Sequence, residues 1–197
     1  KFVQASFFIG FAITTKQGWA NKLPKQATER RDLYPQGVAS GDPTATSLIL
    51  WTRRPPVNDN PANTLTVEIS ATPEFKEILA GGTVQLLADS DWTCRFLVKD
   101  LEPNQVYWYR FIDEHGFASR IGRTMTAPHD DSDTPVRFAF VSCQCPNEGA
   151  LNAYRRMIFE DEARSMDQQL HFVLHLGDFI YEVTWYAEDN PNGNRGR

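Results

Sequence analysis

Apolar and polar residues alternate strictly in two segments near the middle of the chain. Residues Leu65 to Ala71 read LTVEISA, and residues Val106 to Ile112 read VYWYRFI. A period of two is typical of a β-strand with one buried face, so we expect the first strand to keep its polar face in water. On the second strand, one face carries three large aromatic side chains, those of Tyr107, Tyr109 and Phe111.

Shorter apolar runs bounded by turn residues predict further strands at Ser47–Thr52 and Trp92–Val98. Gly81-Gly82, between two apolar runs, predicts a two-residue hairpin turn. Short strands at this spacing favour an all-β immunoglobulin/fibronectin-like sandwich. In such a sandwich Tyr107 would form a tyrosine corner, with its hydroxyl bonded to backbone just upstream; the alternative is an ordinary half-buried aromatic.

The pattern changes after a polar, acidic stretch at residues 124–134. A short apolar strand at Val136–Ser142 is followed by apolar residues at helical spacing over Gly149–Arg164, and a second strand covers Leu170–Leu176. Strand, helix and strand in this order predict a βαβ unit with parallel strands. We therefore divide the chain into residues 1–32, a β-sandwich at 33–128, and the start of an α/β domain at 135–197.

The first 32 residues carry a different signal. The segment Ala5–Thr15 is apolar and almost uncharged, and Pro24–Asp32 reads as a polar linker. An apolar run of this length fits the centre of an export signal, and Lys1-Phe2-Val3 suits the residues that follow a twin-arginine pair. The alternative is an amphipathic or core helix. The export interpretation predicts a periplasmic or extracellular protein. The apolar run is too short to span a bilayer as a helix, and no other segment could span a membrane.

Composition narrows the classes of partner. The 197 residues carry a net charge of -5, which argues against a stable nucleic-acid partner bound through bulk positive charge. The three cysteines, Cys94, Cys143 and Cys145, do not form a disulfide framework, and a single Cys94–Cys145 bridge is the alternative to free thiols. Nothing in the composition departs from that of a folded soluble domain, and we expect a monomer.

Reactive side chains gather where the two predicted parallel strands end. Cys143 follows the first strand, and Asp178 and Tyr181 follow the second after Gly177. Adjacent strands would bring Cys143 and Asp178 together, and a helical turn would place Tyr181 on the same side as Asp178. A carboxylate after a strand and a glycine is a common ligand position for hard metal ions. The alternatives are a helix cap or turn for the aspartate, a small buried hydrophobe for the cysteine and a packed aromatic for the tyrosine.

Other polar residues near these strands fit no site. His171 and His175 would lie about 13 Å apart along a strand, which is too far for one metal ion. Arg155 and Arg156 fit a solvated helix face better than a phosphate site. Cys145 is interpreted as a packing residue.

Three segments together carry a family resemblance: YPQGVASGDPTATSLILWTR, RFAFVSCQ and FVLHLGDFIYE. They resemble the successive signatures of the PhoD-like alkaline phosphatases, in the same order, over roughly residues 33–182. The resemblance implies a calcineurin-type metallophosphoesterase sandwich that hydrolyses phosphomonoesters and phosphodiesters. It also implies that Cys143, Asp178 and Tyr181 hold Fe3+, and that Asp178 bridges to Ca2+. A ferric ion suits such anionic donors because they offset its charge.

The family's further ligands, an Asn-His pair and downstream Asp and His residues, have no counterpart in these 197 residues. We therefore expect an N-terminal fragment that binds phosphate-ester small molecules only as part of a larger site and is inactive alone. Two alternatives stay open: a non-catalytic β-sandwich binding module, and a related exported phospholipase or nucleotidase.

Overall fold

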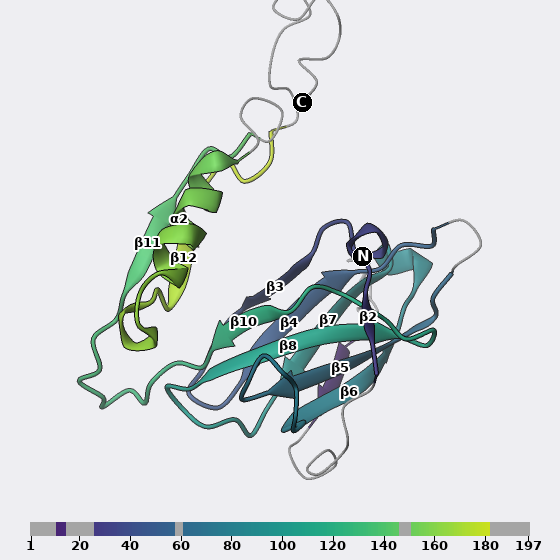
Figure 1. Ribbon diagram of the computed structural model, residues 1–197, viewed down its shortest axis with the longest axis horizontal. Helices are drawn as coiled ribbons and strands as arrows, with labels where there is room; N and C mark the ends of the chain where they lie inside the picture. The colour runs from purple at the N-terminus through teal and green to yellow at the C-terminus, as the bar shows by residue number, and fades with distance from the viewer. Residues whose placement is uncertain (1–10, 15–25, 58–60, 146–150, 182–197) are drawn as a thin grey trace, which may run out of the picture. The chain divides into compact units, whose positions relative to one another are not determined.

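A computed structural model describes residues 11–14, 26–57, 61–145 and 151–181, and of residues 11–14 only the backbone (Figure 1). The chain divides into two compact units, Lys1–Asp133 and Thr134–Arg197. The first unit is built of β-strands, and the second contains a helix between two strands. No helix in the described ranges is long and apolar enough to cross a membrane.

Among the described residues, one sheet of the first unit has four strands in the order β1-β7-β4-β3. Strand β4 is antiparallel to both of its neighbours, whereas β1 runs parallel to β7 at the edge. These strands are β1 (Phe11–Thr14), β3 (Val38–Gly41), β4 (Leu48–Arg53) and β7 (Thr93–Val98). The predicted strands at 47–52 and 92–98 are thereby confirmed to within a residue.

The other sheet of this unit has the order β2-β9-β8-β5-β6, with β10 also paired to β8, as far as the chain is described. Its central strands β5 and β8 match the two alternating segments of the sequence. The strands are β2 (Thr28–Glu29), β5 (Thr64–Ser70), β6 (Ala80–Gln85), β8 (Val106–Asp113), β9 (Phe117–Ala118) and β10 (Gly122–Met125). Short 3-10 helices stand at η2 (Arg31–Leu33) and η3 (Ala88–Ser90).

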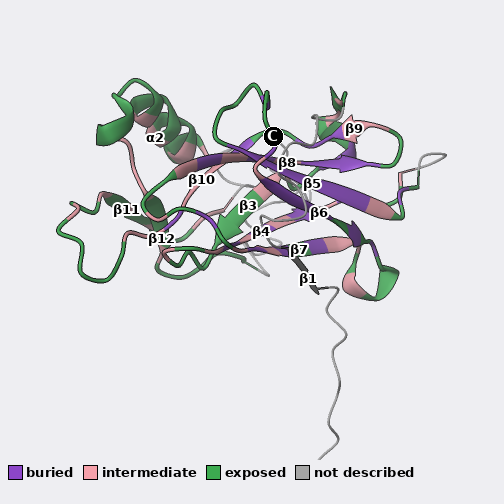
Figure 2. Cartoon of the chain, turned by 90° about the horizontal axis from the view of Figure 1, so that it is seen from below, coloured by how far each residue is buried: buried purple, intermediate pink, exposed green. Residues whose placement is uncertain are grey.

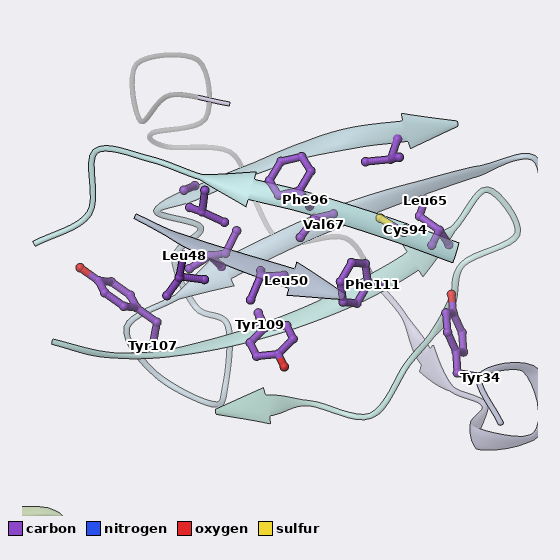
Figure 3. Close-up of a cluster of buried hydrophobic side chains, with 14 of the residues drawn as sticks. Tyr34, Leu48, Leu50, Leu65, Val67, Cys94, Phe96, Tyr107, Tyr109 and Phe111 are labelled. Carbon is purple, nitrogen blue, oxygen red and sulfur yellow. The ribbon is translucent and has the colours of Figure 1, made fainter. Parts of the chain in front are cut away.

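Both sheets contribute to one hydrophobic core, which confirms the predicted sandwich (Figure 3). The aromatic face of β8 is fully buried, as its alternation predicted, and it meets apolar side chains of β4 and β7. Burial of this many apolar side chains is the main favourable term in the stability of the unit. The labelled core residues are Tyr34, Leu48, Leu50, Leu65, Val67, Cys94, Phe96, Tyr107, Tyr109 and Phe111.

The tyrosine corner is also confirmed. The Tyr107 hydroxyl accepts a hydrogen bond of 2.9 Å from the backbone N–H of Glu102, five residues upstream. The same hydroxyl lies 3.5 Å from the Glu102 carbonyl oxygen. A buried phenol needs a partner of this kind, and the bond ties the turn before β8 to the strand itself.

The Gly81-Gly82 prediction is wrong, because both glycines lie inside β6. They pair with Glu68 and Val67 of β5 in the antiparallel ladder. The connection between the two strands is longer and runs through residues 71–79, where the side chain of Phe75 is buried. Burial of Phe75 stabilises this longer connection, so the two strands are joined without a two-residue turn at the glycines.

The polar face expected on β5 is likewise buried rather than wet. Glu68 is only 2% exposed. The Arg110 guanidinium on the neighbouring strand donates two hydrogen bonds to its carboxylate, of 2.7 and 2.9 Å, and itself lies over the ring of Phe75. A buried carboxylate is tolerated when it is paired in this way, so alternation alone could not reveal that the second face is covered.

Part of the predicted linker is built into the sandwich. The backbone N–H groups of Thr28 and Arg30 donate to the carbonyl oxygens of Gly116 and Ala118 at 3.0 and 2.9 Å. Backbone pairing needs no apolar pattern, which is why the stretch reads as a linker. Of the apolar run at residues 5–15, only β1 lies within the described residues, so the export signal stays a prediction.

The second unit confirms the predicted order of strand, helix and strand. Strand β11 (Phe138–Val141) and β12 (Phe172–His175) pair in parallel, with helix α2 (Asn152–Glu162) and the short η4 (Met166–Gln168) between them. No residue of α2 is buried (Figure 2), and the strands expose large apolar side chains. Phe138 and Phe172, partners in the register, stack at 5.2 Å between ring centroids yet stay 50% and 44% exposed.

Candidate metal centre

The loops that follow β11 and β12 continue the pairing of the two strands. The backbone N–H of Cys143 donates to the Gly177 carbonyl oxygen at 3.0 Å, and that of Gln144 donates to the Asp178 carbonyl oxygen at 3.1 Å. These bonds fix the two loops against each other beyond the carboxyl ends of the strands. Parallel strands place functional loops at this edge, as the sequence predicted.

The three predicted ligand side chains meet at one oxygen atom. The Cys143 thiol donates a hydrogen bond to Asp178 Oδ2 at 3.3 Å, and the Tyr181 hydroxyl donates to the same Oδ2 at 2.9 Å. All three residues are exposed to solvent. A sulfur, a carboxylate and a phenol therefore share a single accessible point on the surface of the second unit.

The backbone at this point is strained. Cys143 and Asp178 both adopt left-handed conformations, with φ of 58° and 54°, and Gly177 has φ of 141°. Residues with a Cβ seldom adopt positive φ, and such positions concentrate at functional sites. A Cβ on Gly177 would meet nothing within 4 Å, so the backbone angle and not the available space requires glycine there.

The charges of the cluster suit a cation. Hydrogen bonds from the Tyr181 hydroxyl and the Cys143 thiol hold the pKa of Asp178 below its usual range. The neighbouring sulfur of Cys143 and the carboxylate of Asp178 raise the pKa of Tyr181. Ionised phenol would meet negative charge here, and a bound cation reverses that balance.

The donor spacing also fits a metal ion. Donors at about 2.0 to 2.3 Å from one metal lie about 3 Å from each other, and the observed separations are 2.9 and 3.3 Å. Within the described ranges, no third histidine, cysteine or carboxylate joins Cys143 and Asp178 in one group. The cluster therefore offers three donors of two elements, sulfur and oxygen.

Two details differ from the sequence prediction. The segment from Asp178 to Tyr181 is not helical, and the phenol reaches the carboxylate through an irregular bend. Gln144 was not singled out, but its side-chain Nε2 donates to the Phe179 carbonyl oxygen at 2.8 Å and ties the two loops together. In the sequence, the position of Gln144 between two cysteines at a strand end is the one feature that indicates a role for it.

The two arginines of the helix lie on a solvated face as predicted, whereas His171 and His175 are only half-buried. Arg155 and Arg156 are exposed on α2, and Arg156 pairs with Glu160 one turn along. His175 Nδ1 accepts a long contact of 3.4 Å from the Gly177 N–H, and its Nε2 atom is buried without a hydrogen-bond partner in the described part of the chain. Cys145 is half-buried, and all three cysteines are free.

A pocket of about 410 Å³ opens beside the cluster. It lies between the loop after β11 and the first turns of α2, and Cys143 forms part of its wall. Leu151, Tyr154 and Met157 also line the pocket and supply apolar surface. This volume can take a small organic molecule beside Cys143.

Comparison with known proteins identifies the class. The sequence profile of the PhoD-like phosphatase N-terminal domain matches residues 18–128, and the chain belongs to this family.

Two relatives illustrate the match. Alkaline phosphatase D of Bacillus subtilis (strain 168) is 37% identical over 153 residues, which is 74% of this chain and 25% of that protein. A solved structure described as "Structure of PhoD" is 34% identical, with a TM-score of 0.66 over 75% of this chain and 28% of that one. The chain thus spans about a quarter of the length of these relatives.

Proposed function

We propose that this chain supplies the first three ligands of the metal centre of an alkaline phosphatase of the PhoD type, which hydrolyses phosphate monoesters and diesters. The observation that carries the proposal is the convergence of Cys143, Asp178 and Tyr181 on one oxygen atom. Family membership supports a phosphatase. Identity of 37% to a protein described as alkaline phosphatase D supports this activity in particular.

The three donors fit the ferric and calcium ions that the family resemblance implies. Thiolate, carboxylate and phenolate side chains would hold Fe3+, and the Asp178 carboxylate would also contribute to the binding of Ca2+. When bound, such ions act as Lewis acids that neutralise phosphate charge and align an attacking oxygen with the phosphorus.

The residues of this chain position the donors. The backbone bonds between Cys143, Gln144 and the opposing loop hold the thiol and the carboxylate side by side before any ion arrives. The Gln144 side chain fixes the loop that leads to Tyr181. A preorganised site of this kind does not have to reorder its ligands during binding. The adjoining pocket leaves space for the organic part of an ester.

We propose further that the 197 residues alone are inactive. A multi-metal centre needs more than three protein donors, and the described ranges offer no further cluster. The apolar side chains that β11, β12 and α2 expose also support this proposal, because complete soluble domains bury most such surface. Phe140 and Leu176, for example, are 68% and 61% exposed.

We propose that the protein works outside the cytoplasm as a monomer on small phosphate esters. The apolar run at residues 5–15 and the polar stretch after it support export. Separation of periplasm, cytoplasm and medium of the producing cells, followed by detection with an antibody, tests the location. Protein confined to the cytoplasm would refute export.

The activity is tested in a chimera in which this chain replaces the matching segment of the Bacillus subtilis alkaline phosphatase D. We expect hydrolysis of p-nitrophenyl phosphate and of bis(p-nitrophenyl) phosphate, abolished by a chelator. In this chimera Asp178→Asn should lower kcat by about 100-fold or more, because it removes an anionic metal ligand. Asp167→Asn alters an exposed carboxylate of the same unit and serves as the matched control.

Metal content measured on the same proteins separates a folding failure from a wrong assignment. A folded chimera that carries Asp178→Asn and keeps both its metal and its rate would contradict the proposal. A chain that binds no metal in any form would favour the non-catalytic binding module.

A further inference from the structure

A second polar pocket, of about 240 Å³, lies on the β-sandwich unit. It is formed by the 3-10 helix η2, the turn that follows it and one residue beyond β9. Its lining comprises Arg31, Tyr34, Pro35, Gln36, Gly37 and Arg120. All of these residues belong to the first unit, and none belongs to the cluster around Cys143.

The fold builds this pocket on a rigid base. Tyr34, labelled in Figure 3, is 2% exposed, and its hydroxyl donates to the Phe117 carbonyl oxygen at 2.9 Å. The Gly37 N–H donates to the Tyr34 carbonyl oxygen at 2.9 Å, and Gly37 adopts φ of +69°. The Arg120 Cδ atom lies 3.6 Å from the point where a Cβ on Gly37 would stand. The turn therefore needs glycine for its backbone, and the stem of Arg120 lies against it.

The pocket has an excess of hydrogen-bond donors. The Arg120 guanidinium has no hydrogen-bond or ion-pair partner among the described residues. Arg31 uses only its Nε atom, on the carboxylate of Glu29 outside the lining. Gln36 Oε1 accepts from Arg53 NH1 at 3.3 Å, which leaves the amide nitrogen of Gln36 as a donor. No acidic residue is among those that line the pocket.

Two arginines and a glutamine that line one small cavity match the chemistry of a tetrahedral oxyanion. Guanidinium groups bind phosphate through paired N–H donors in a fixed plane. We propose that this pocket binds a phosphate group, either inorganic phosphate or the phosphoryl end of a small ester. Because it uses only residues of the sandwich, the proposal does not depend on the metal centre.

The test uses the full chain in the presence of a chelator, which removes any contribution of metal at Cys143. Isothermal titration with inorganic phosphate, at an ionic strength matched with chloride, should show saturable binding with one site per chain. Arg120→Gln should raise Kd about tenfold or more, and Arg120→Lys should raise it less because the charge remains but the fork is lost. Titration with glycerol phosphate in parallel shows whether the free ion or an ester is preferred.

Matched variants locate the site. Arg95→Gln removes an equal charge from an exposed position on β7, outside the pocket, and should leave Kd within about twofold. Cys143→Ser should also leave Kd unchanged, and circular dichroism confirms that each variant is folded.

Absence of saturable binding to either phosphate compound would overturn the proposal. An equal loss in Arg95→Gln and Arg120→Gln would overturn it as well, because binding would then reflect overall charge. Loss of phosphate binding in Cys143→Ser would overturn the proposal, because it would assign the phosphate to the second unit. A chain that binds phosphate but no metal would support this pocket and contradict the proposed metal centre.

Discussion

At the residue scale, single carboxylates with several partners hold irregular parts of the sandwich in place. Glu114 accepts hydrogen bonds from the backbone N–H groups of Asn63 and Thr64, at 2.8 and 3.0 Å, and from both of their side chains. Burial alone would raise the pKa of Glu114, but these hydrogen bonds outweigh it and lower the pKa to about 2. The carboxylate thereby fixes the segment that leads into β5.

Glu114→Gln should lower the free energy of unfolding by about 1 kcal/mol at neutral pH, because it removes charge-assisted bonds. The pKa is lowered in the folded protein from its usual 4.5, so the stabilisation is complete above about pH 4.5 and is lost as the pH falls towards 2. Urea denaturation at pH 7 and pH 3 measures both the loss of stability and its dependence on pH, with the exposed Glu74→Gln as control. A difference between wild type and Glu114→Gln that grows on acidification would contradict this account.

A fully buried ion pair, Arg54–Asp113, also holds an irregular part of the sandwich in place. The side chains of Arg54 and Asp113 are both 0% exposed, and Arg54 Nε and NH2 donate to Asp113 Oδ2 at 3.2 and 3.0 Å. The other carboxylate oxygen of Asp113 accepts from the backbone N–H groups of His115 and Phe117. The pair therefore joins the end of β4 to the tight turn between β8 and β9.

Asp113→Asn should cost about 3 to 5 kcal/mol of unfolding free energy, because it leaves the Arg54 charge buried without compensation. The matched change Asp32→Asn breaks an exposed pair with Arg30 and should cost far less, because water and salt screen exposed charges. If chemical denaturation showed equal losses of unfolding free energy in the two variants, burial of the Arg54–Asp113 pair would not increase its contribution to stability.

At the scale of the elements, close packing between β8 and β10 depends on one glycine. Gly122 pairs with Tyr109, and a Cβ on Gly122 would lie 2.3 Å from the Tyr109 ring. Strand β3 contains a contrasting glycine, Gly41, whose added Cβ would meet nothing within 4 Å. The two positions thus separate the effect of steric overlap from that of backbone flexibility.

Gly122→Ala should destabilise the sandwich by about 1 to 3 kcal/mol, because the buried Tyr109 ring has to move. Gly41→Ala should change stability by less than about 0.5 kcal/mol in either direction. Thermal unfolding followed by circular dichroism compares the two variants. A neutral Gly122→Ala would mean that β10 shifts away from β8 at little cost.

Much of the element structure could be predicted from the sequence, and the exceptions have physical reasons. Alternation predicted the buried aromatic face of β8 because period two follows directly from strand geometry. It could not predict that Glu68 on β5 is buried, because that depends on Arg110 from a neighbouring strand. Gly81 and Gly82 predict a turn because a glycine pair is typical of a two-residue hairpin. Such a pair can also lie inside a strand, and only its pairing with β5 distinguishes the two cases.

The candidate site was predictable to a similar extent. Parallel strands bring Cys143 and Asp178 together at their carboxyl ends whatever the details of the loops. The contact of Tyr181 depends on an irregular bend instead of a helix. The bond from Gln144 to the Phe179 backbone depends on the conformation of both loops, which local sequence does not encode.

At the scale of the whole molecule, the two units differ in how completely they bury their apolar surface. The sandwich has a closed core, whereas the strands and helix around the candidate metal centre expose theirs (Figure 2). The chain spans about a quarter of the length of its relatives, and the proposed function assigns the candidate metal centre to the second unit.

Titration of the chain with ferric ion, followed by visible absorption, tests most directly whether Cys143, Asp178 and Tyr181 form one metal site. We expect a charge-transfer band that saturates at one ion per chain and is lost in Tyr181→Phe and Cys143→Ser. The matched variants Tyr154→Phe and Cys145→Ser should retain it. A chain that stays colourless, or a band that survives both Tyr181→Phe and Cys143→Ser, would contradict the shared site.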